Sequence, residues 1–264
     1  MAEFSAKDVA ALRKETGVGM MDCKKALADA EGDMEQAKQL LRERGLTKAG
    51  ARSDRENDQG AVAIATSGSV AAAAQLRCET DFSAKSDDFV KITQAIADAA
   101  LGEGEAAGAA FSDQIDDLKI TKKENIELGR VVRIEAAEGN VLDAYLHVQD
   151  GRGVNAVLVE LAGGTPEQAH DLAVHIAFAK PVALSREEIP AEAVEEARQS
   201  FEGVTRAEGK PEQAIAKIVE GRLNKWYSER VLPEQPYVKD DKVTVAAWLG
   251  DTTIVRFAQI VIGA

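Results

Sequence analysis

The sequence predicts an α+β fold with an N-terminal three-helix module, a two-part α+β core with antiparallel sheets, and an inserted antiparallel helical hairpin of the coiled-coil type. Three observations support this. Apolar residues follow a helical period up to residue 46, paired strand-like runs with two-residue turns come next, and two amphipathic stretches surround a breaker near residue 209. At 264 residues the chain exceeds one ordinary core, so several domains are expected.

The expected domain boundaries follow changes in composition. The parts are a three-helix module (1–46), a polar linker (47–59), a first core half (60–140), a second core half (141–182 and 232–264) and the inserted hairpin (183–231). The linker has no apolar face, which is typical of a boundary between domains.

The first part is expected to form three short helices. Ser5 to Asp8 has the spacing of a capping box, Thr16 to Gly19 ends the first helix, Asp33 caps the third, and Gly45 ends it. The Gly-Val-Gly-Met loop between two helices resembles that of the ubiquitin-associated (UBA) three-helix fold, a partner-binding module. Met20, in this loop, is a candidate contact residue because methionine adapts to varied surfaces. Gap-filling in the module's own core explains it equally well.

Each core half is expected to place a strand hairpin before a helix. In the first half, strands 61–66 and 69–78 meet at Ser67-Gly68, followed by a helix to about residue 100, a weaker helix at 109–118 and a strand at 130–136. In the second half, strands 141–148 and 154–161 meet at Asp150-Gly151, a helix takes 166–179, and segments 243–248 and 252–262 return to the sheet.

The inserted part has the pattern of two amphipathic helices. Apolar residues recur at helical spacing before the breaker at Val194, Ala197, Phe201 and Val204, and after it at Ile215, Val219, Leu223 and Trp226. Two such helices around a short breaker form an antiparallel hairpin. The hairpin's own apolar seam explains the two stripes, and a homodimer formed through the hairpin is the alternative.

The charge balance is acidic, with a net charge of −13 and a pI near 4.8. Such a protein repels phosphates, so direct binding of nucleic acid is not expected. Residues 1–55 nevertheless carry +1, and the segment from Lys38 to Arg55 holds six basic residues against two acidic ones. This segment suits an acidic protein surface, or it is a solvated helix end and linker.

The two cysteines, Cys23 and Cys78, lie far apart in apolar patterns, which favours a reducing compartment without disulfides. No charged-then-apolar leader opens the chain, and no apolar run is long enough to cross a membrane. We therefore expect a cytoplasmic protein without membrane attachment. The alternative is that the sequence is the mature form of an organelle protein whose presequence has been removed.

The segment from Arg77 to Lys85 places an aromatic ring beside a carboxylate where a strand pattern changes to a helical one. Thr80 or Asp81 is expected to cap the new helix. Phe82 would then lie in the opening turn, from which its side chain can protrude toward a partner. Burial of Phe82 in the chain's own core is the alternative.

Residues suited to catalysis or metal binding are sparse. The three histidines, His147, His170 and His175, lack metal-ligand spacing, and no phosphate-loop or dinucleotide-binding motif is present. Cys78 could act as a nucleophile, but strand alternation favours a small buried side chain. We therefore expect no catalytic residue, no metal, no cofactor and no enzyme activity.

Two long motifs resemble signatures of the bacterial elongation factor Ts family. The first runs from Leu12 to Leu27 (LRKETGVGMMDCKKAL) and the second from Cys78 to Lys85 (CETDFSAK). Lys210-Pro211 with Val219 to Leu223 is similar to the hairpin region of that family, and Glu234 to Val238 to its closing segment. The likeness runs in order along essentially the whole chain.

The resemblance implies a guanine-nucleotide exchange factor for the GTPase elongation factor Tu, bound in its GDP-bound and nucleotide-free forms during translation elongation. In this family the three-helix module docks on the GTPase domain, and the Asp-Phe pair is inserted between two GTPase helices near the magnesium site. The second core half contacts the distal β-barrel domain. The implied partner-binding residues are Thr80, Asp81, Phe82 and Ser83 in the inserted motif, Lys24 and Met20 in the module, and His147 in the second core half.

Plain structural roles remain open for three of these residues. Lys24 could be only a solvated helix residue, Asp81 only a helix cap, and His147 only a strand side chain. A rival function is an adaptor that binds ubiquitin-like or ribosome-associated proteins through the module and dimerises through the hairpin.

The chain departs from the family pattern at three places. Ser83 stands where valine is usual, which is expected to loosen the packing behind Phe82. Lys122-Lys123 stand where Ile-Gly is common at an interface, so that site is not carried over. From the last residues of the sequence we also expect no counterpart of the additional C-terminal helical module of some members.

Overall fold

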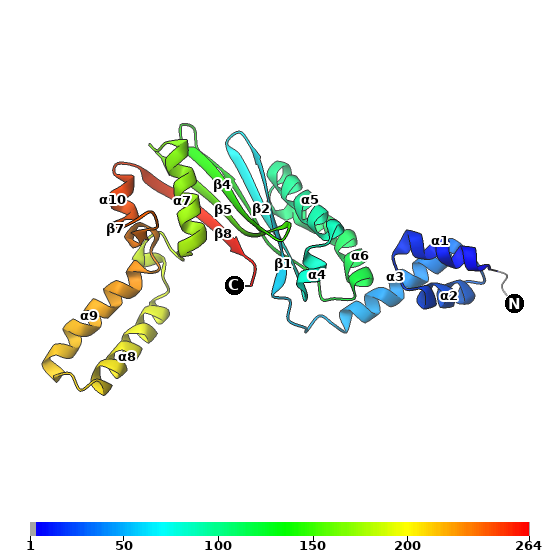
Figure 1. Cartoon of the computed structure of the whole chain (residues 1–264), viewed down its shortest axis with the longest axis horizontal. Helices are drawn as coiled ribbons and strands as arrows, with labels where there is room; N and C mark the ends of the chain where they lie inside the picture. Colours follow the sequence, from blue (N-terminus) through cyan, green and yellow to red (C-terminus); the bar gives the residue numbers. More distant parts are fainter. Residues whose placement is uncertain (1–3, 264) are drawn as a thin grey trace.

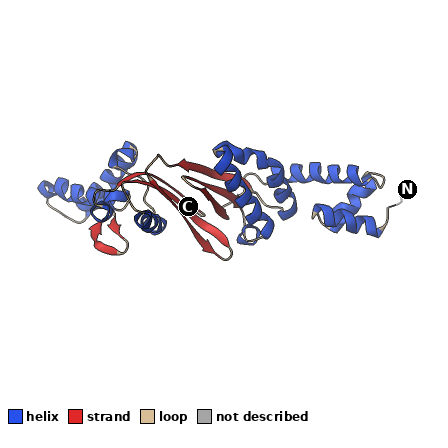
Figure 2. Cartoon of the chain, turned by 90° about the horizontal axis from the view of Figure 1, so that it is seen from above, coloured by secondary structure: helices blue, strands red, loops and turns tan. Residues whose placement is uncertain are grey.

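The computed structural model describes residues 4–263 and confirms the α+β class. Figure 1 shows an elongated molecule with three helices at one end, a sheet flanked by helices in the middle, and a helical hairpin projecting at the other end. Seen from above, the large sheet occupies the centre of the molecule (Figure 2). The N-terminal helices and the helical hairpin therefore lie at opposite ends of the long axis.

The N-terminal part consists of α1 (Ala6–Thr16), α2 (Met20–Asp29) and α3 (Met34–Gly50). The predicted capping box is present, because Ser5 Oγ accepts from the Asp8 N–H and the Asp8 carboxylate accepts from the Ser5 N–H. Gly17, at a φ of +68°, ends α1 in the left-handed conformation that glycine adopts readily. Leu12 and Leu27 are fully buried between the helices. That this arrangement is a UBA-like fold stays a prediction.

The third helix is longer than predicted. It passes Gly45 and continues to Gly50, into the predicted linker, because it packs along α6 (Ser112–Lys122). A Cβ on Gly45 would lie 2.6 Å from the Ile120 side chain, so glycine allows the two helices to approach closely. Packing against a distant element thus overrides the local stop signal.

The basic residues of segment 38–55 find partners within the chain. Lys38 pairs with Glu15 and Glu35, Arg42 with Asp113 and Asp117, Arg44 with Asp29, and Arg55 with Glu79. These ion pairs connect α3 to its own module, to α6 and to the core. They account for the composition of the segment without an acidic partner.

The described residues of the core form a six-stranded antiparallel sheet in the order β3-β2-β1-β5-β4, with β8 also paired to β5, and a small two-stranded antiparallel sheet of β6 (Pro236–Tyr237) and β7 (Asp240–Thr244). The strands of the larger sheet are β1 (Gln59–Ser67), β2 (Val70–Cys78), β3 (Glu127–Glu135), β4 (Val141–Gln149), β5 (Arg152–Ala162) and β8 (Thr253–Val261). The prediction of antiparallel sheets is confirmed, and the strand hairpins of the two halves share the larger sheet. Within that sheet the halves join through the single pair Val62–Gly153, where a Cβ on Gly153 would lie 2.2 Å from the Val62 carbonyl oxygen.

Helices and short elements complete the core. They are α4 (Asp81–Ala84), α5 (Asp87–Glu103), the 3₁₀ helix η1 (Glu105–Phe111), α7 (Pro166–Ala179), η2 (Arg186–Glu188), η3 (Leu232–Glu234), β6 (Pro236–Tyr237), β7 (Asp240–Thr244) and α10 (Val245–Leu249). The weaker helix predicted at 109–118 is thus a 3₁₀ segment followed by α6. The return of segment 252–262 to the sheet is confirmed by the pairing of β8 with β5.

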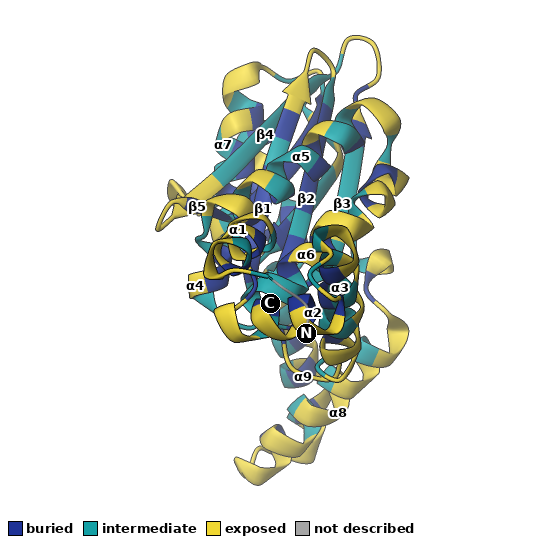
Figure 3. Ribbon diagram, turned by 90° about the vertical axis from the view of Figure 1, so that its right-hand side faces the viewer, coloured by how far each residue is buried: buried dark blue, intermediate teal, exposed yellow. Residues whose placement is uncertain are grey.

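Side chains alternate between the two faces of each strand, and this alternation builds the core in layers. Ala61 and Leu76 pack against α5, whereas Val62, on the opposite face of β1, packs in one cluster with Leu158 of β5. Val157, on the other face of β5, packs against α7. The two halves therefore share an inner layer, and each carries one helix on its outer side. Figure 3 shows the buried residues following β1 and β2.

Both predicted strand hairpins are present. β1 and β2 turn through Gly68-Ser69, one residue later than predicted, and Gly68 has a φ of +57°. Asp150 and Gly151 join β4 to β5 with φ values of +52° and +79°, as a type I′ turn requires.

The inserted part forms the predicted pair of helices, α8 (Ala191–Ala207) and α9 (Glu212–Ser228). Its seam consists of Ile215, Val219 and Leu223 from α9 against Val194, Ala197 and Phe201 from α8. Val204, predicted on the seam, is exposed, and Thr205 is buried instead because its hydroxyl donates to the Phe201 carbonyl oxygen. Dimerisation through the hairpin stays a prediction.

Candidate functional site

The Asp-Phe motif forms the short helical turn α4 directly after β2. Thr80 is the N-cap, because its Oγ1 accepts from the Ser83 N–H at 3.3 Å. Phe82 is the second residue of the turn and is 84% exposed. Burial of this ring in the chain's own core is therefore wrong, and the turn presents it to solvent.

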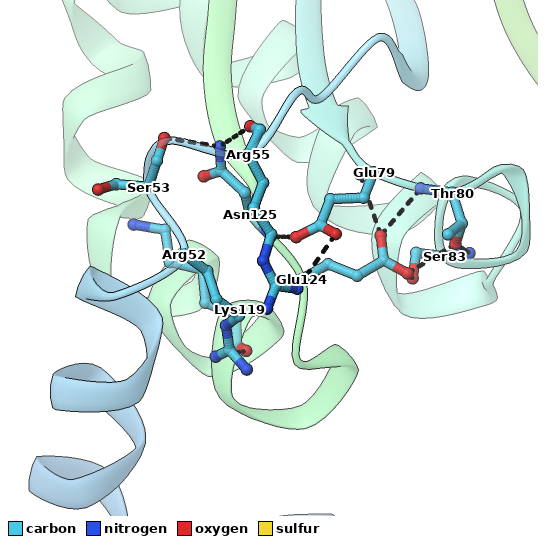
Figure 4. Close-up of polar contacts among 9 residues, drawn as sticks. All are labelled: Arg52, Ser53, Arg55, Glu79, Thr80, Ser83, Lys119, Glu124 and Asn125. Carbon is cyan, nitrogen blue, oxygen red and sulfur yellow. Dashed lines mark hydrogen bonds and ion pairs between the residues drawn. The ribbon is translucent and has the colours of Figure 1, made fainter.

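The Glu124 carboxylate bonds to this turn and to the residue before it, as Figure 4 shows. Glu124 Oε2 accepts from the backbone N–H groups of Glu79 and Thr80, both at 3.1 Å. Glu124 Oε1 accepts from Thr80 Oγ1 at 2.6 Å and from Ser83 Oγ at 2.5 Å. Two carboxylate oxygens offer about four acceptor positions, so the hydrogen-bonding capacity of Glu124 is filled.

Looser packing behind Phe82 because of Ser83 stays a prediction, and the structure shows a contact of Ser83 that was not expected. The side chain is buried, and its hydroxyl donates to Glu124. A charge-assisted hydrogen bond thus stands at the position where an apolar contact would form with valine. The two residues lie 41 positions apart, so the local sequence contained no sign of this contact.

Asn125 connects the same segment to the linker. Its backbone N–H donates to Glu79 Oε1 at 2.6 Å, and its Nδ2 donates to the carbonyl oxygens of Ser53 and Arg55 at 3.1 and 2.7 Å. Arg55 in turn forms an ion pair with Glu79, with 3.4 Å between Arg55 Nη1 and Glu79 Oε2. The turn, the approach to β3 and the linker therefore form one hydrogen-bonded network (Figure 4).

Lys85 connects the turn to the second core half. Its Nζ lies 2.7 Å from Asp81 Oδ2 and 3.2 Å from Asp150 Oδ2, in the β4–β5 turn. The hydrogen bond from Lys85 lowers the pKa of the Asp81 carboxyl group, and the hydrogen bonds to Asp81 and Asp150 raise the pKa of Lys85. Thr80 is the N-cap, so Asp81 is not, and the Asp81 carboxylate is paired with Lys85 in the residue next to the exposed ring.

The other predicted contact residues lie elsewhere. Met20 and Lys24 lie on α2, at the N-terminal end of the molecule, whereas α4 lies next to the sheet (Figure 1). Met20 is 49% exposed, so gap-filling in the module's core does not explain it, and Lys24 is exposed. His147 is exposed on β4, three residues before Asp150, and thus lies on the strand that leads to the turn contacted by Lys85.

The described part of the chain offers little for covalent or metal chemistry. Within residues 4–263, no group of three or more metal-ligating side chains occurs. Cys78 is buried, and burial raises the pKa of its thiol to about 12, which suppresses the reactive thiolate. The same residues include no helix with the length and apolar character required to span a bilayer.

The two lysines before Glu124 have structural roles. Lys122 Nζ lies 2.8 Å from the Asp88 carboxylate of α5. Lys123 ends α6 with a φ of +61°, a left-handed conformation that glycine adopts without strain. The glycine common in the resembling family therefore suits the backbone at this position.

Sequence reasoning did not identify Glu124 or Asn125 as part of the site. Their only local signal is a polar break between a helix and a strand. Their contacts with the turn and the linker span 41 to 72 residues, which no periodicity encodes.

The fold and the turn define an α+β protein that exposes an aromatic ring on a hydrogen-bonded turn. A family model described as "Elongation factor TS" matches residues 79–264. The chain is 46% identical to elongation factor Ts of a Nocardioides species and 40% identical to that of Kineococcus radiotolerans, with each chain covered in full. It is 42% identical to elongation factor Ts of Deinococcus radiodurans, with 96% of this chain and 97% of the relative covered. The chain therefore belongs to the elongation factor Ts family, which confirms the resemblance of the two motifs.

Proposed function

We propose that this protein is a guanine-nucleotide exchange factor for elongation factor Tu, which it binds in the GDP-bound and nucleotide-free forms. Membership of the elongation factor Ts family supports this role in translation elongation. The observation that supports the site most strongly is the exposed ring of Phe82 on a turn fixed by Glu124. Nucleotide exchange makes and breaks no covalent bond, so the proposed role is catalysis of exchange without enzyme chemistry.

Asp81 and Phe82 act together in the proposed mechanism. A GTPase holds its nucleotide through backbone contacts to the phosphates and through Mg²⁺. Insertion of the Phe82 ring between two helices of the partner separates them, and the Asp81 carboxylate disturbs the groups that position the ion. The hydrogen bond from Lys85 holds the pKa of the Asp81 carboxyl group below its usual value, which favours the charged form beside the ring.

The energetics of exchange follow from linkage. The factor binds the nucleotide-poor conformation of the GTPase best, and therefore shifts the population toward it. The coupling is reciprocal, because a factor that weakens GDP binding must itself be weakened by GDP to the same extent. Rebinding of GTP then releases the factor.

Met20, Lys24 and His147 extend the proposed interface. The first two lie at the N-terminal end of the molecule and His147 lies in the second core half, so the contacts are spread along the long axis (Figure 1). This spacing supports a partner held at several points, with the module on the GTPase domain and the second core half on the distal domain.

The test is the release of fluorescent GDP from elongation factor Tu, chased with excess unlabelled GDP. We expect this protein to accelerate release when it is present at a fraction of the GTPase concentration, because each molecule acts repeatedly. Unchanged release with a matched partner would overturn the proposal and favour the adaptor, which a pull-down on ubiquitin would then examine.

A further inference from the structure

We propose that Glu124 is a positioning residue for nucleotide exchange, which acts by holding the Asp81-Phe82 turn in the shape that enters the partner. This inference rests on the proposed exchange function. It goes further because it assigns a role to a residue that lies outside the Asp-Phe motif and makes no contact itself with the ring.

The Glu124 carboxylate accepts more hydrogen bonds from this segment than any other described side chain does, three from Thr80 and Ser83 and one from the Glu79 N–H. The turn is a single helical turn of four residues, too short to be stable through its own backbone hydrogen bonds. Its cap contact, from the Ser83 N–H to Thr80 Oγ1, is long at 3.3 Å. The two hydroxyl groups of the turn approach Glu124 more closely, at 2.6 and 2.5 Å. Hydrogen bonds to a charged acceptor are also stronger than neutral ones.

Glu124 is itself held from the other side. The next residue, Asn125, bonds through its backbone to Glu79 and through its side chain to the linker carbonyl oxygens of Ser53 and Arg55. Glu124 thus lies between the turn and a segment that Asn125 bonds to Glu79 and to the linker. This position restricts the motion of the Glu124 side chain and therefore of the turn. A turn that is ordered before binding avoids the entropy loss of ordering during insertion.

An amide at this position replaces the carboxylate only in part. Glutamine keeps the size of the side chain and its oxygen can still accept from the two backbone N–H groups, but its NH₂ group can only donate to the two hydroxyl groups, and the charge that strengthens all four hydrogen bonds is lost. Glu124→Gln should therefore loosen the turn without leaving a cavity. We expect it to reduce the acceleration of GDP release about tenfold, the effect of losing roughly one charge-assisted hydrogen bond.

Glu160→Gln is the matched control. Glu160 is buried in the second core half and accepts hydrogen bonds from the Ala137 N–H, Asn140 and Arg256, but none from the turn. Like Glu124, Glu160 is a carboxylate that accepts several hydrogen bonds, but it lies in the second core half and not at the turn. A loss of exchange that came from general destabilisation would affect both variants.

The decisive experiment is a double-mutant cycle of Glu124→Gln and Phe82→Ala, measured as acceleration of fluorescent GDP release. If Glu124 acts through the ring, Glu124→Gln slows wild type about tenfold and has little further effect on Phe82→Ala. The inference is overturned if Glu124→Gln matches wild type, if its effect is the same in both backgrounds, or if Glu160→Gln is equally slow. Absence of acceleration by wild type would instead overturn the exchange function itself.

A second variant covers the case in which Glu124→Gln does not fold. Ser83→Ala keeps the Thr80 cap and removes only the buried hydroxyl group that donates to Glu124. Slower exchange by Ser83→Ala than by wild type, with no further slowing when Ser83→Ala is added to Phe82→Ala, supports the inference. Exchange equal to wild type by a folded Ser83→Ala would overturn it.

Discussion

At the scale of single residues, Phe82 and Phe89 show how opposite environments arise seven positions apart. Phe82 is 84% exposed on α4, whereas Phe89 is fully buried between α5 and the sheet. Phe89→Ala should lower the free energy of unfolding by about 3–5 kcal/mol, because it leaves a cavity. Phe82→Ala should change it by less than about 0.5 kcal/mol. Denaturant unfolding of both variants tests the contrast, and equal losses would contradict it.

Lys123 gives a prediction of the opposite sign. A side chain in the left-handed conformation is strained, so Lys123→Gly should raise the free energy of unfolding by about 0.5–1 kcal/mol. Lys122→Gly is the control. It lies in the helix and pairs with Asp88, so the same change there should lower the free energy by about 1 kcal/mol. Thermal unfolding of both variants would contradict this account if the two shifts had the same sign.

His175 predicts a dependence of stability on pH. The ring is buried, its Nδ1 accepts from the Val238 N–H at 3.2 Å, and its Nε2 therefore donates to Gln235 Oε1 at 3.0 Å. Burial lowers the pKa of His175 below its ordinary value of 6.5. The neutral ring thus contributes stability that is present above pH 6.5 and is lost as pH falls toward the lower folded-state pKa.

The measurement is the free energy of unfolding of wild type and His175→Gln between pH 7 and pH 5. Through the window between the two pKa values, wild type should lose up to about 1.4 kcal/mol per pH unit more than the variant, which has no imidazole to protonate. Parallel pH profiles of the two proteins would show that His175 does not contribute this dependence.

The sequence predicts some of these residues and misses others for a clear reason. Phe82 could be placed at a turn because a strand pattern ends just before it. The contacts of Ser83 could not be predicted, since its partner Glu124 lies 41 positions later. Val204 was predicted on the buried seam, whereas Thr205 is the buried residue. A buried hydroxyl can donate to the preceding turn of its own helix, which an apolar pattern does not reveal.

At the scale of elements, the hairpin α8–α9 is held by its own seam. Leu223 is buried there, and Leu223→Ala should remove about 2–5 kcal/mol of local stability. Hydrogen exchange should then become faster across 191–228 while β5 keeps its protection, because opening is local. Lys225→Ala, exposed on the same helix, is the control. Faster exchange throughout the sheet would contradict the local character of the seam.

Strands and helices with strong periodicity were predicted well, because alternation and helical stripes reflect the faces that each element buries. The joining of the two strand hairpins in one sheet was not predicted. It depends on a single pair, Val62–Gly153, and a glycine in a strand does not by itself reveal what approaches it. The continuation of α3 to Gly50 was missed for a similar reason, since α6 provides its contacts.

At the scale of the whole molecule, the module is attached to the core through α3 and α6. Arg42 bonds to Asp113 and Asp117 of α6, which lie 71 and 75 positions away. Together with the contacts of Asn125 to the linker, these bonds connect the three-helix module to the turn. The predicted contact points thus belong to one connected framework, although they lie far apart along its length.

Nucleotide exchange on elongation factor Tu is proposed to depend on the Phe82 ring, which α4 presents to solvent. The most direct test compares Phe82→Ala with Phe178→Ala, which removes an equally large ring that is 75% exposed on α7, away from the turn. Fluorescent GDP release from elongation factor Tu is measured with each folded variant and with wild type. We expect Phe82→Ala to lose most of the acceleration and Phe178→Ala to retain it. Full acceleration by Phe82→Ala, or equal losses in both variants, would contradict it.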